Sequence, residues 1–212
     1  MYNSLHMVIT YHGGTFVKVS FGDTTLAFNP ISKKSKLKQS KFGSDIALIS
    51  QNHDDCNGVE QVSHGAREPF IISGPGEYEV KKVTVTGFQS ETTYGGKSAI
   101  NTIYIVKLEG MKICFLGTLG NDKITDGAFE AMENIDILFI PIGGNGMLEP
   151  SKAHQLGVKI GSHVVVPIGF EAASLKKFLK EEGDEGIKPA EKLTAKKKDV
   201  ESKEGEVVVL KV

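Results

Sequence analysis

Short apolar runs rich in β-branched residues recur along the whole chain and predict β-strands. The predicted strands cover residues 7–11, 15–21, 24–28, 45–50, 69–73, 82–87, 101–108, 111–116, 135–140, 163–168 and 206–210. Gly22-Asp23 and Glu109-Gly110 separate pairs of neighbouring runs, which indicates tight hairpins. We therefore expect a strand-rich protein whose early sheet is antiparallel at least in part.

Helical periodicity is less frequent and predicts three helices, at residues 122–132, 150–160 and 172–181. Pro150 in the first turn and Gly161 just beyond the last turn define the second of these most clearly. A strand-rich first half followed by alternating strands and helices predicts an α/β (α+β) protein, with a mixed sheet or two stacked sheets flanked by helices. The chain has 212 residues, 40% of them hydrophobic, so residues 1–212 are long enough for one domain with a full core.

The charge balance changes this picture little, because 25 basic side chains face 26 acidic ones. No overall field attracts nucleic acid or an anionic membrane. Two groups of lysines, within 33–41 and at 196–198, are best interpreted as solvated segments; phosphate or nucleic-acid contact is the alternative, but no aromatic residues are interleaved for base stacking. No apolar stretch approaches the roughly 20 residues of a membrane helix, so we expect a soluble, cytoplasmic protein.

Candidate chemistry lies where apolar strands end in polar loops. The loops begin at Ser50, Gly117, Pro141 and Pro167. The first of them contains His53, Asp54, Asp55 and Cys56 in a row, and imidazole, carboxylate and thiolate groups are the side chains that hold zinc. Cys56 next to His53 also suggests a thiolate nucleophile, although no third partner follows it.

Several landmarks together resemble the metallo-β-lactamase superfamily, in particular its branch of small bacterial metal-dependent hydrolases related to the L-ascorbate-6-phosphate lactonase group. They are Tyr11-His12-Gly13-Gly14, the 50–56 loop, Gly74-Pro75-Gly76-Glu77-Tyr78-Glu79, Asn101-Thr102-Ile103-Tyr104 and Gly143-Gly144-Asn145-Gly146. The similarity extends from about Met7 to Val212, which leaves 1–6 as a candidate extension. The resemblance implies an αββα sandwich, with a dinuclear metal centre at one edge that activates water for hydrolysis.

Carried over residue by residue, the resemblance places the family's metal ligands at Gln51, His53, Asp55, Cys56, Thr92, Thr118 and Gly169. Only His53 and Asp55 keep the family's residue type. Threonine and glycine cannot replace an aspartate and histidines as ligands, so the resemblance implies a degenerate dinuclear site. Two further family pairs, Gly-His and Asp-Pro, are Gly13-Gly14 and Asn29-Pro30 here.

We therefore expect no cofactor and a pseudoenzyme with a binding or scaffold role, in which the fold supplies a small-ligand pocket or a homo-oligomeric scaffold. The alternative is a hydrolase of a lactone, phosphoester or nucleic acid that holds one zinc or manganese ion through His53, Asp55 and Cys56, with His12 or Glu91 in reserve. Backbone amides of the 143–146 loop would suit a small anionic ligand. The other histidines, His64, His154 and His163, and the pair Glu77 and Glu79, are interpreted as surface or packing residues, and Cys114 as inert core.

Overall fold

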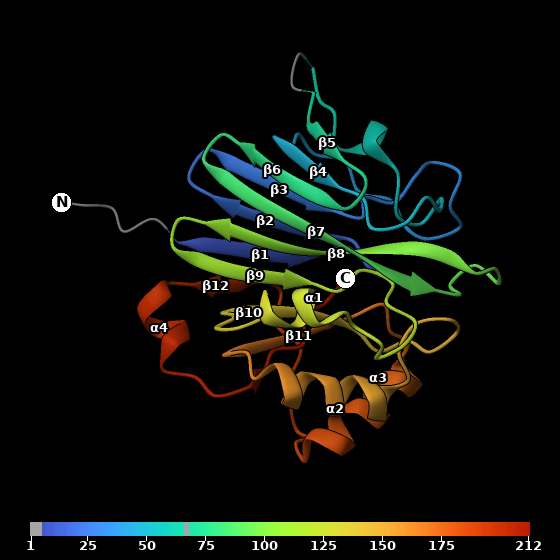
Figure 1. The fold of residues 1–212 in the computed structure, drawn as a ribbon, viewed down its shortest axis with the longest axis vertical. Helices are drawn as coiled ribbons and strands as arrows, with labels where there is room; N and C mark the ends of the chain where they lie inside the picture. The colour runs from blue at the N-terminus through green and yellow to red at the C-terminus, as the bar shows by residue number, and fades with distance from the viewer. Residues whose placement is uncertain (1–5, 66–67) are drawn as a thin grey trace.

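Two β-sheets packed face to face form the centre of the molecule (Figure 1). The computed structural model describes residues 6–65 and 68–212. Six strands form the first sheet, in the order β12 (Leu193–Ala195), β1 (Met7–Tyr11), β2 (Val17–Phe21), β3 (Thr24–Phe28), β4 (Ile46–Leu48) and β5 (Phe70–Ile72). Seven form the second, in the order β13 (Glu206–Val207), β11 (Val164–Ile168), β10 (Ile137–Pro141), β9 (Met111–Phe115), β8 (Ala99–Leu108), β7 (Val83–Thr92) and β6 (Gly76–Val80).

Both sheets are mixed, as the sequence predicts. The hairpins β2–β3 and β8–β9 are antiparallel, and their turns contain Gly22 and the pair Glu109-Gly110. Glu109 and Gly110 both have positive φ angles, of 50° and 78°, which suits the twist of a tight hairpin. The strands that lead to the candidate loops are parallel to a neighbour: β4 to β3, and β10 to both β9 and β11. Their carboxyl ends therefore meet at one edge of the sandwich.

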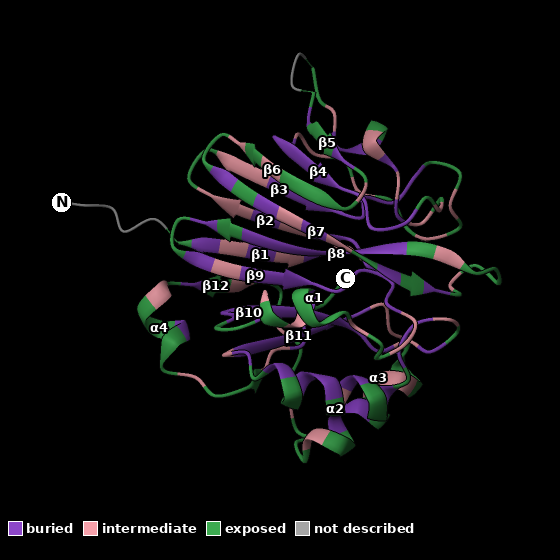
Figure 2. Cartoon of the chain, viewed as in Figure 1, coloured by how far each residue is buried: buried purple, intermediate pink, exposed green. Residues whose placement is uncertain are grey.

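The main core lies between the sheets and takes alternate residues of each strand, such as Ile137 and Phe139 of β10. Figure 2 shows the central strands as largely buried. Phe28 of the first sheet meets Phe115 and Phe139 of the second, with ring centroids 4.9 and 6.1 Å apart. All three rings are fully buried. Burial of such side chains contributes roughly 1.5–3 kcal/mol each, so this layer anchors the strands from which the candidate loops begin.

The two outer faces are covered differently. Helices α1 (Asp126–Glu130), α2 (Pro150–Ile160) and α3 (Ala172–Glu182) form a second apolar cluster with the outer face of the second sheet. The outer face of the first sheet is covered instead by residues of the segments 31–42 and 59–62, the second of which includes the short 3-10 helix Val59–Gln61. The short helix α4 (Lys197–Glu201) adds Val200 to the core between the sheets. The expected sandwich of two mixed sheets is thus confirmed, with few flanking helices.

The element bounds agree best where a local signal fixes them. Helix α2 begins at Pro150 and ends before Gly161, whose φ is 66°, as predicted. Helix α1 begins four residues later than predicted because Thr125 caps it, its Oγ1 accepting a hydrogen bond from Ala128 N. Strands β6 and β12 and helix α4 were not predicted. The proposed extension at residues 1–6 lies, except for His6, outside the described residues.

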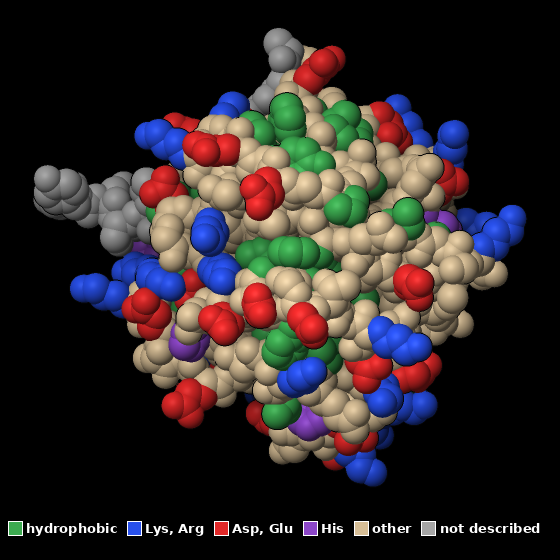
Figure 3. Space-filling model, in the orientation of Figure 1, with side chains coloured by type: hydrophobic (Ala, Val, Ile, Leu, Met, Phe, Trp, Pro, Cys, Tyr) green, Lys and Arg blue, Asp and Glu red, His purple; other side chains and the backbone are tan. Residues whose placement is uncertain are grey.

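One charged segment is not the solvated stretch that the sequence indicates. Lys197 donates hydrogen bonds of 2.8 Å to both carboxylate oxygens of Asp136, a residue with no exposed surface. Elsewhere the face in Figure 3 carries acidic and basic side chains intermixed. In the part of the chain that the structure describes, no helix is long and apolar enough to span a bilayer.

Candidate functional site

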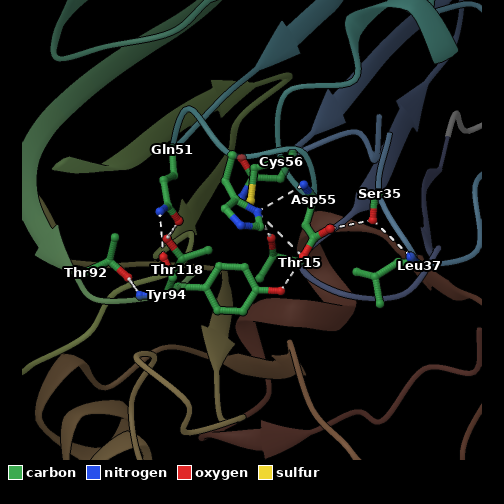
Figure 4. A network of polar contacts seen from close by, with 11 residues as sticks. Thr15, Ser35, Leu37, Gln51, Asp55, Cys56, Thr92, Tyr94 and Thr118 are labelled. Carbon is green, nitrogen blue, oxygen red and sulfur yellow. Dashed lines mark hydrogen bonds and ion pairs between the residues drawn. The ribbon is translucent and has the colours of Figure 1, made fainter. Parts of the chain in front are cut away.

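The carboxyl ends of β4, β7, β9 and β11, with the loops that follow them, meet at one edge of the sandwich and contain all seven positions at which the resemblance places metal ligands. Figure 4 shows Gln51, Asp55, Cys56, Thr92 and Thr118 among them. Gln51, His53, Asp55 and Cys56 follow β4, Thr92 ends β7, Thr118 follows β9 and Gly169 follows β11. The topology therefore brings these positions together, and their side chains decide what the edge can bind.

A buried network of neutral side chains occupies the centre of this edge. Thr118 Oγ1 donates to Gln51 Oε1 at 2.9 Å and lies 3.1 Å from Asn101 Oδ1, which also accepts from Thr118 N at 2.8 Å. Asn101 Nδ2 donates to Ser90 Oγ and to Leu116 O. We call Gln51, Ser90, Asn101 and Thr118 the amide network; each is at most 6% exposed.

The network leaves no room for a larger residue before Thr118. A Cβ atom at Gly117 would lie 2.4 Å from Asn101 Oδ1 and 2.5 Å from Ser50 Oγ, and the φ of Gly117 is 64°. Only glycine accommodates both the conformation and the close approach. The neighbouring Asn29 extends the neutral set, since its Nδ2 donates to Ser50 Oγ at 2.8 Å and to Thr15 Oγ1 at 2.9 Å.

Tyr94, in the turn between β7 and β8, links the amide network to the His53–Asp55 loop. Its hydroxyl donates to Asp55 Oδ2 at 2.6 Å, and its carbonyl accepts from Gln51 Nε2 at 3.0 Å. Its ring lies edge-on to His53, with centroids 5.1 Å apart. Burial and then the hydrogen bond to Asp55 raise the pKa of the Tyr94 hydroxyl, so it remains a donor at neutral pH. No pattern in the sequence singles out Tyr94, because a tyrosine in a Gly-rich turn carries no distinctive signal.

His53 and Asp55 lie together, but Asp55 is already engaged. His53 Nδ1 is 3.6 Å from Asp55 Oδ2 and accepts a hydrogen bond from Asp55 N at 3.2 Å. Asp55 Oδ1 accepts a hydrogen bond from Ser35 Oγ, and Asp55 Oδ2 accepts one from the Tyr94 hydroxyl. A metal ion at Asp55 would have to share a carboxylate oxygen with one of these donors.

Cys56 lies away from the solvent and does not complete a thiolate pair. Its side chain is fully buried, and Sγ is 3.7 Å from Thr15 Oγ1. Burial raises the pKa of the Cys56 thiol to about 12, against a smaller opposing effect of the contact with Thr15. Cys114 is also a free, buried thiol, and burial raises its pKa too. Neither is poised as a nucleophile near neutral pH.

The last two positions are closed by backbone packing. Thr92 Oγ1 donates to Gly146 O at 3.2 Å and accepts from Tyr94 N at 3.1 Å. Gly169 has a φ of 64°, and a Cβ atom there would lie 2.9 Å from Met147 Sδ. A histidine side chain at this position would therefore need the Met147 side chain to move and would have to adopt the left-handed backbone conformation.

The reserve residues are dispersed. His12 packs against Phe16 and Phe42 on the outer side of the first sheet, where burial and then the charges of Lys18 and Lys38 lower its pKa to about 4. Other residues singled out by the sequence lie elsewhere: Glu77, Glu79, Glu91 and His64 are exposed, His154 pairs with Glu182 on α3, and His163 contacts Lys203 O. Within the described residues, no three His, Cys, Asp or Glu side chains are placed to hold one metal ion. The donor set does not fit the dinuclear centre.

Two cavities flank Tyr94. A deeper one of about 330 Å³ lies between Tyr94, Met147 and the beginnings of α2 and α3. A shallower and more open one of about 660 Å³ lies over His53, Asp55 and the 93–96 turn. Tyr94 and Asn145 line both, so the two cavities adjoin at these residues.

The two sheets form a sandwich whose candidate site lies at the carboxyl ends of the central strands. The chain belongs to the beta-lactamase superfamily, whose domain model matches residues 8–169. A UPF0173 metal-dependent hydrolase of Thermoplasma acidophilum is 25% identical over 72% of this chain and 76% of its own length. One of Listeria innocua is 24% identical over 80% of this chain and 87% of its own length. A solved structure from Thermotoga maritima, named as a candidate zinc-dependent hydrolase of the metallo-beta-lactamase superfamily, is 25% identical, covers 97% of this chain and 98% of its own, and has a TM-score of 0.77. The predicted family is confirmed.

Proposed function

We propose that this chain is a member of its hydrolase family that works without a dinuclear metal centre, as a binding protein for a small ligand. The observation that carries this proposal is the direct hydrogen bond between Gln51 and Thr118, 2.9 Å long and buried. Two positions that the family resemblance assigns to ligands of the metal centre bond to each other here, and the space between them is filled.

The free-energy cost of burying unpaired polar groups also favours a site without a dinuclear metal centre. A buried polar group left without a partner costs about 1–3 kcal/mol, and a buried unpaired charge costs more. Amides and hydroxyls satisfy one another, whereas the family's histidines and aspartate need a cation between them. In this proposal the amide network takes the place of the metal and links the loops after β4 and β9 to β7 and β8. This gives the edge a structural role and leaves the deeper cavity beside Tyr94 as the place for a ligand.

Metal analysis tests the proposal directly. Untagged protein, purified without chelator and then incubated with zinc or manganese and desalted, is expected to retain less than about a tenth of an equivalent, because fewer than the four ligands of a tight site converge. Mass spectrometry of total metal supplies the number. A near-stoichiometric, chelator-removable ion would overturn the proposal.

The His53–Asp55 pair favours a second candidate function, a hydrolase that uses one ion. Both side chains line the open cavity of about 660 Å³, so a weakly held ion there would meet substrate from the solvent. This candidate predicts a chelator-sensitive esterase, lactonase or phosphoesterase activity that His53→Ala and Asp55→Ala each abolish, while the exposed neighbour Asp54→Ala retains it. Activity that survives both changes would remove the pair from the reaction.

A further inference from the structure

We infer that a second cavity, at the end of the sandwich opposite the candidate site, binds a neutral phenol or aromatic alcohol that donates a hydrogen bond to His163. This cavity lies between the last turn of α2, the residues that lead into β11, the segment 203–205 and Glu182 at the end of α3. Its size, its apolar lining and the direction of its free hydrogen bonds point to this ligand. The proposed function does not depend on this cavity, so either can fail without the other.

The second cavity has the size of a ligand site, and its lining is more apolar than polar. Its volume of about 370 Å³ is within the roughly 300–1,000 Å³ of small-molecule sites. Val158 and Val165 line it together with Gly157, Gly161 and Gly205. A Cβ atom at Gly161 or Gly205 would meet no atom within 4 Å, so open space adjoins both glycines. A ligand in the cavity would cover part of Val158, which is 68% exposed.

His163 gives the cavity an acceptor of fixed direction. Its Nδ1 is 2.8 Å from Lys203 O. A carbonyl oxygen only accepts, so Nδ1 carries a proton, and in the neutral ring Nε2 is left as an acceptor. Within the residues that the structure describes, Nε2 has no hydrogen-bond partner. A ligand that donates one hydrogen bond therefore matches His163, whereas a ligand that only accepts does not.

The donors around the cavity are already paired. Lys203 Nζ donates to Glu206 Oε1 at 2.7 Å, and Ser162 Oγ donates to Val164 O at 3.3 Å. Gly205 N donates to Ser162 O at 3.1 Å. An acceptor on the ligand would have to break one of these hydrogen bonds to be satisfied.

Two carboxylates complete the lining. Glu182 Oε1 lies 3.0 Å from His154 Nδ1, so an ion-pair partner is already close to it, and Glu204 is exposed to solvent. Ionised carboxylates accept hydrogen bonds and repel an anion. An ammonium ion would lose much of its hydration against the apolar lining. A neutral hydroxyl group on an apolar ring therefore fits better than an ion of either sign.

Matched probes test the direction of the hydrogen bond. Para-ethylphenol, para-ethylanisole and para-ethylbenzoate share one apolar body and carry a donor, an acceptor alone and an anion. Isothermal titration at about pH 8, where an ordinary imidazole is neutral, is expected to give roughly three- to tenfold tighter binding for the phenol than for the ether, the value of one hydrogen bond. The benzoate should bind more weakly than the phenol.

Variants locate the site and the acceptor. Val158→Asp should weaken phenol binding several-fold, because it brings a charge to the apolar lining. The matched control Gln155→Asp adds the same charge at an exposed position of α2 outside the lining and should leave the affinity unchanged. His163→Phe keeps a ring but removes the acceptor, so the phenol and the ether should then bind equally. Circular dichroism checks that each variant is folded, and Val158→Asp still tests the site if His163→Phe is not.

Four results would overturn the inference. They are an ether or benzoate that binds the unchanged protein as tightly as the phenol, no phenol binding at millimolar concentration, phenol binding that Val158→Asp leaves intact, and a phenol preference that persists in His163→Phe. The third result would place the probe elsewhere, for example in the cavity beside Tyr94.

Discussion

The two ends of the β-sandwich bury polar groups in opposite ways. At the amino ends of β4 and β10 the buried groups are charged: Asp45 accepts from Lys81 Nζ at 2.7 Å, and Asp136 accepts from Lys197 Nζ at 2.8 Å. At the carboxyl ends the amide network is neutral and pairs only with itself and the backbone. Each aspartate also accepts a backbone N–H of a neighbouring strand, from Thr25 and Lys112 respectively.

The difference shows what each end of the sandwich requires. A carboxylate at a strand start can be matched by one lysine that reaches in from the surface, so the charge is compensated within the chain. A cluster of imidazoles and carboxylates at the other end would be compensated only by bound metal. Neutral amides and hydroxyls avoid that dependence. The chain thus keeps charge where its own lysines supply the partner and has none at the centre of the candidate site.

The largest expected effect comes from Asn101→Ala, which would remove the centre of the amide network. Asn101 is fully buried and its amide group bonds Ser90, Leu116 O and the Thr118 amide, so the change should lower the free energy of unfolding by about 3–4 kcal/mol. Urea unfolding followed by circular dichroism measures it. Asn52→Ala, on the exposed part of the 50–58 loop, is the matched control and should change stability by no more than about 0.5 kcal/mol.

A loss below about 1 kcal/mol for Asn101→Ala would contradict the comparison, because the network would then not be what holds the loops. A loss of stability in Asn101→Ala that added zinc reverses would contradict the comparison more strongly. Such a result would show that the carboxyl ends still depend on an ion.

Part of this architecture could be predicted from local sequence signals. Pro150 and Gly161 fix α2 because one suits a first turn and the other a left-handed cap. Strand β6 was missed because it is an edge strand, with only Tyr78 and Val80 half-buried, so its apolar pattern is weak and its pairing with β7 determines it. Strand β12 pairs with β1, from which it is separated by most of the chain, and no local signal encodes that contact.

The candidate site was predictable as a set of positions but not as a set of contacts. The family resemblance identified Gln51 and Thr118, and the hydrogen bond between them depends on the packing of β4 beside β8 and β9. Tyr94 and Ser35 entered only with the structure, and Asn101 was identified only as part of a family landmark, since each is an ordinary residue whose role comes from its partner. Lys197 was interpreted as solvated for the same reason: its partner Asp136 lies 61 residues away in the chain.

The charged end should respond to Lys197→Met, with a loss of about 2–3 kcal/mol. The buried Asp136 carboxylate would keep the Lys112 amide but lose its counter-charge, and the partial exposure of Lys197 limits the cost. Lys198→Met, on the exposed side of α4, is the control. Desolvation lowers the pKa of Lys197, but the hydrogen bond and charge of Asp136 outweigh it, so the pKa is raised. This stabilisation is therefore fully present below the ordinary lysine pKa and is lost only as the pH rises through the higher folded value.

The smallest effect in this comparison is expected for Thr118→Val, which keeps the shape of the side chain and the backbone amide bonded to Asn101. It removes one hydroxyl donor and leaves Gln51 Oε1 without its partner, so the loss should be about 1–2 kcal/mol. Combined with Gln51→Leu, which removes the stranded acceptor, the double variant should lose less than the sum of the single changes, because the two groups depend on each other. Additive losses would mean that Gln51 and Thr118 are stabilised separately. The network would then be two independent contacts, and the carboxyl ends would have no neutral counterpart to the Asp136–Lys197 pair.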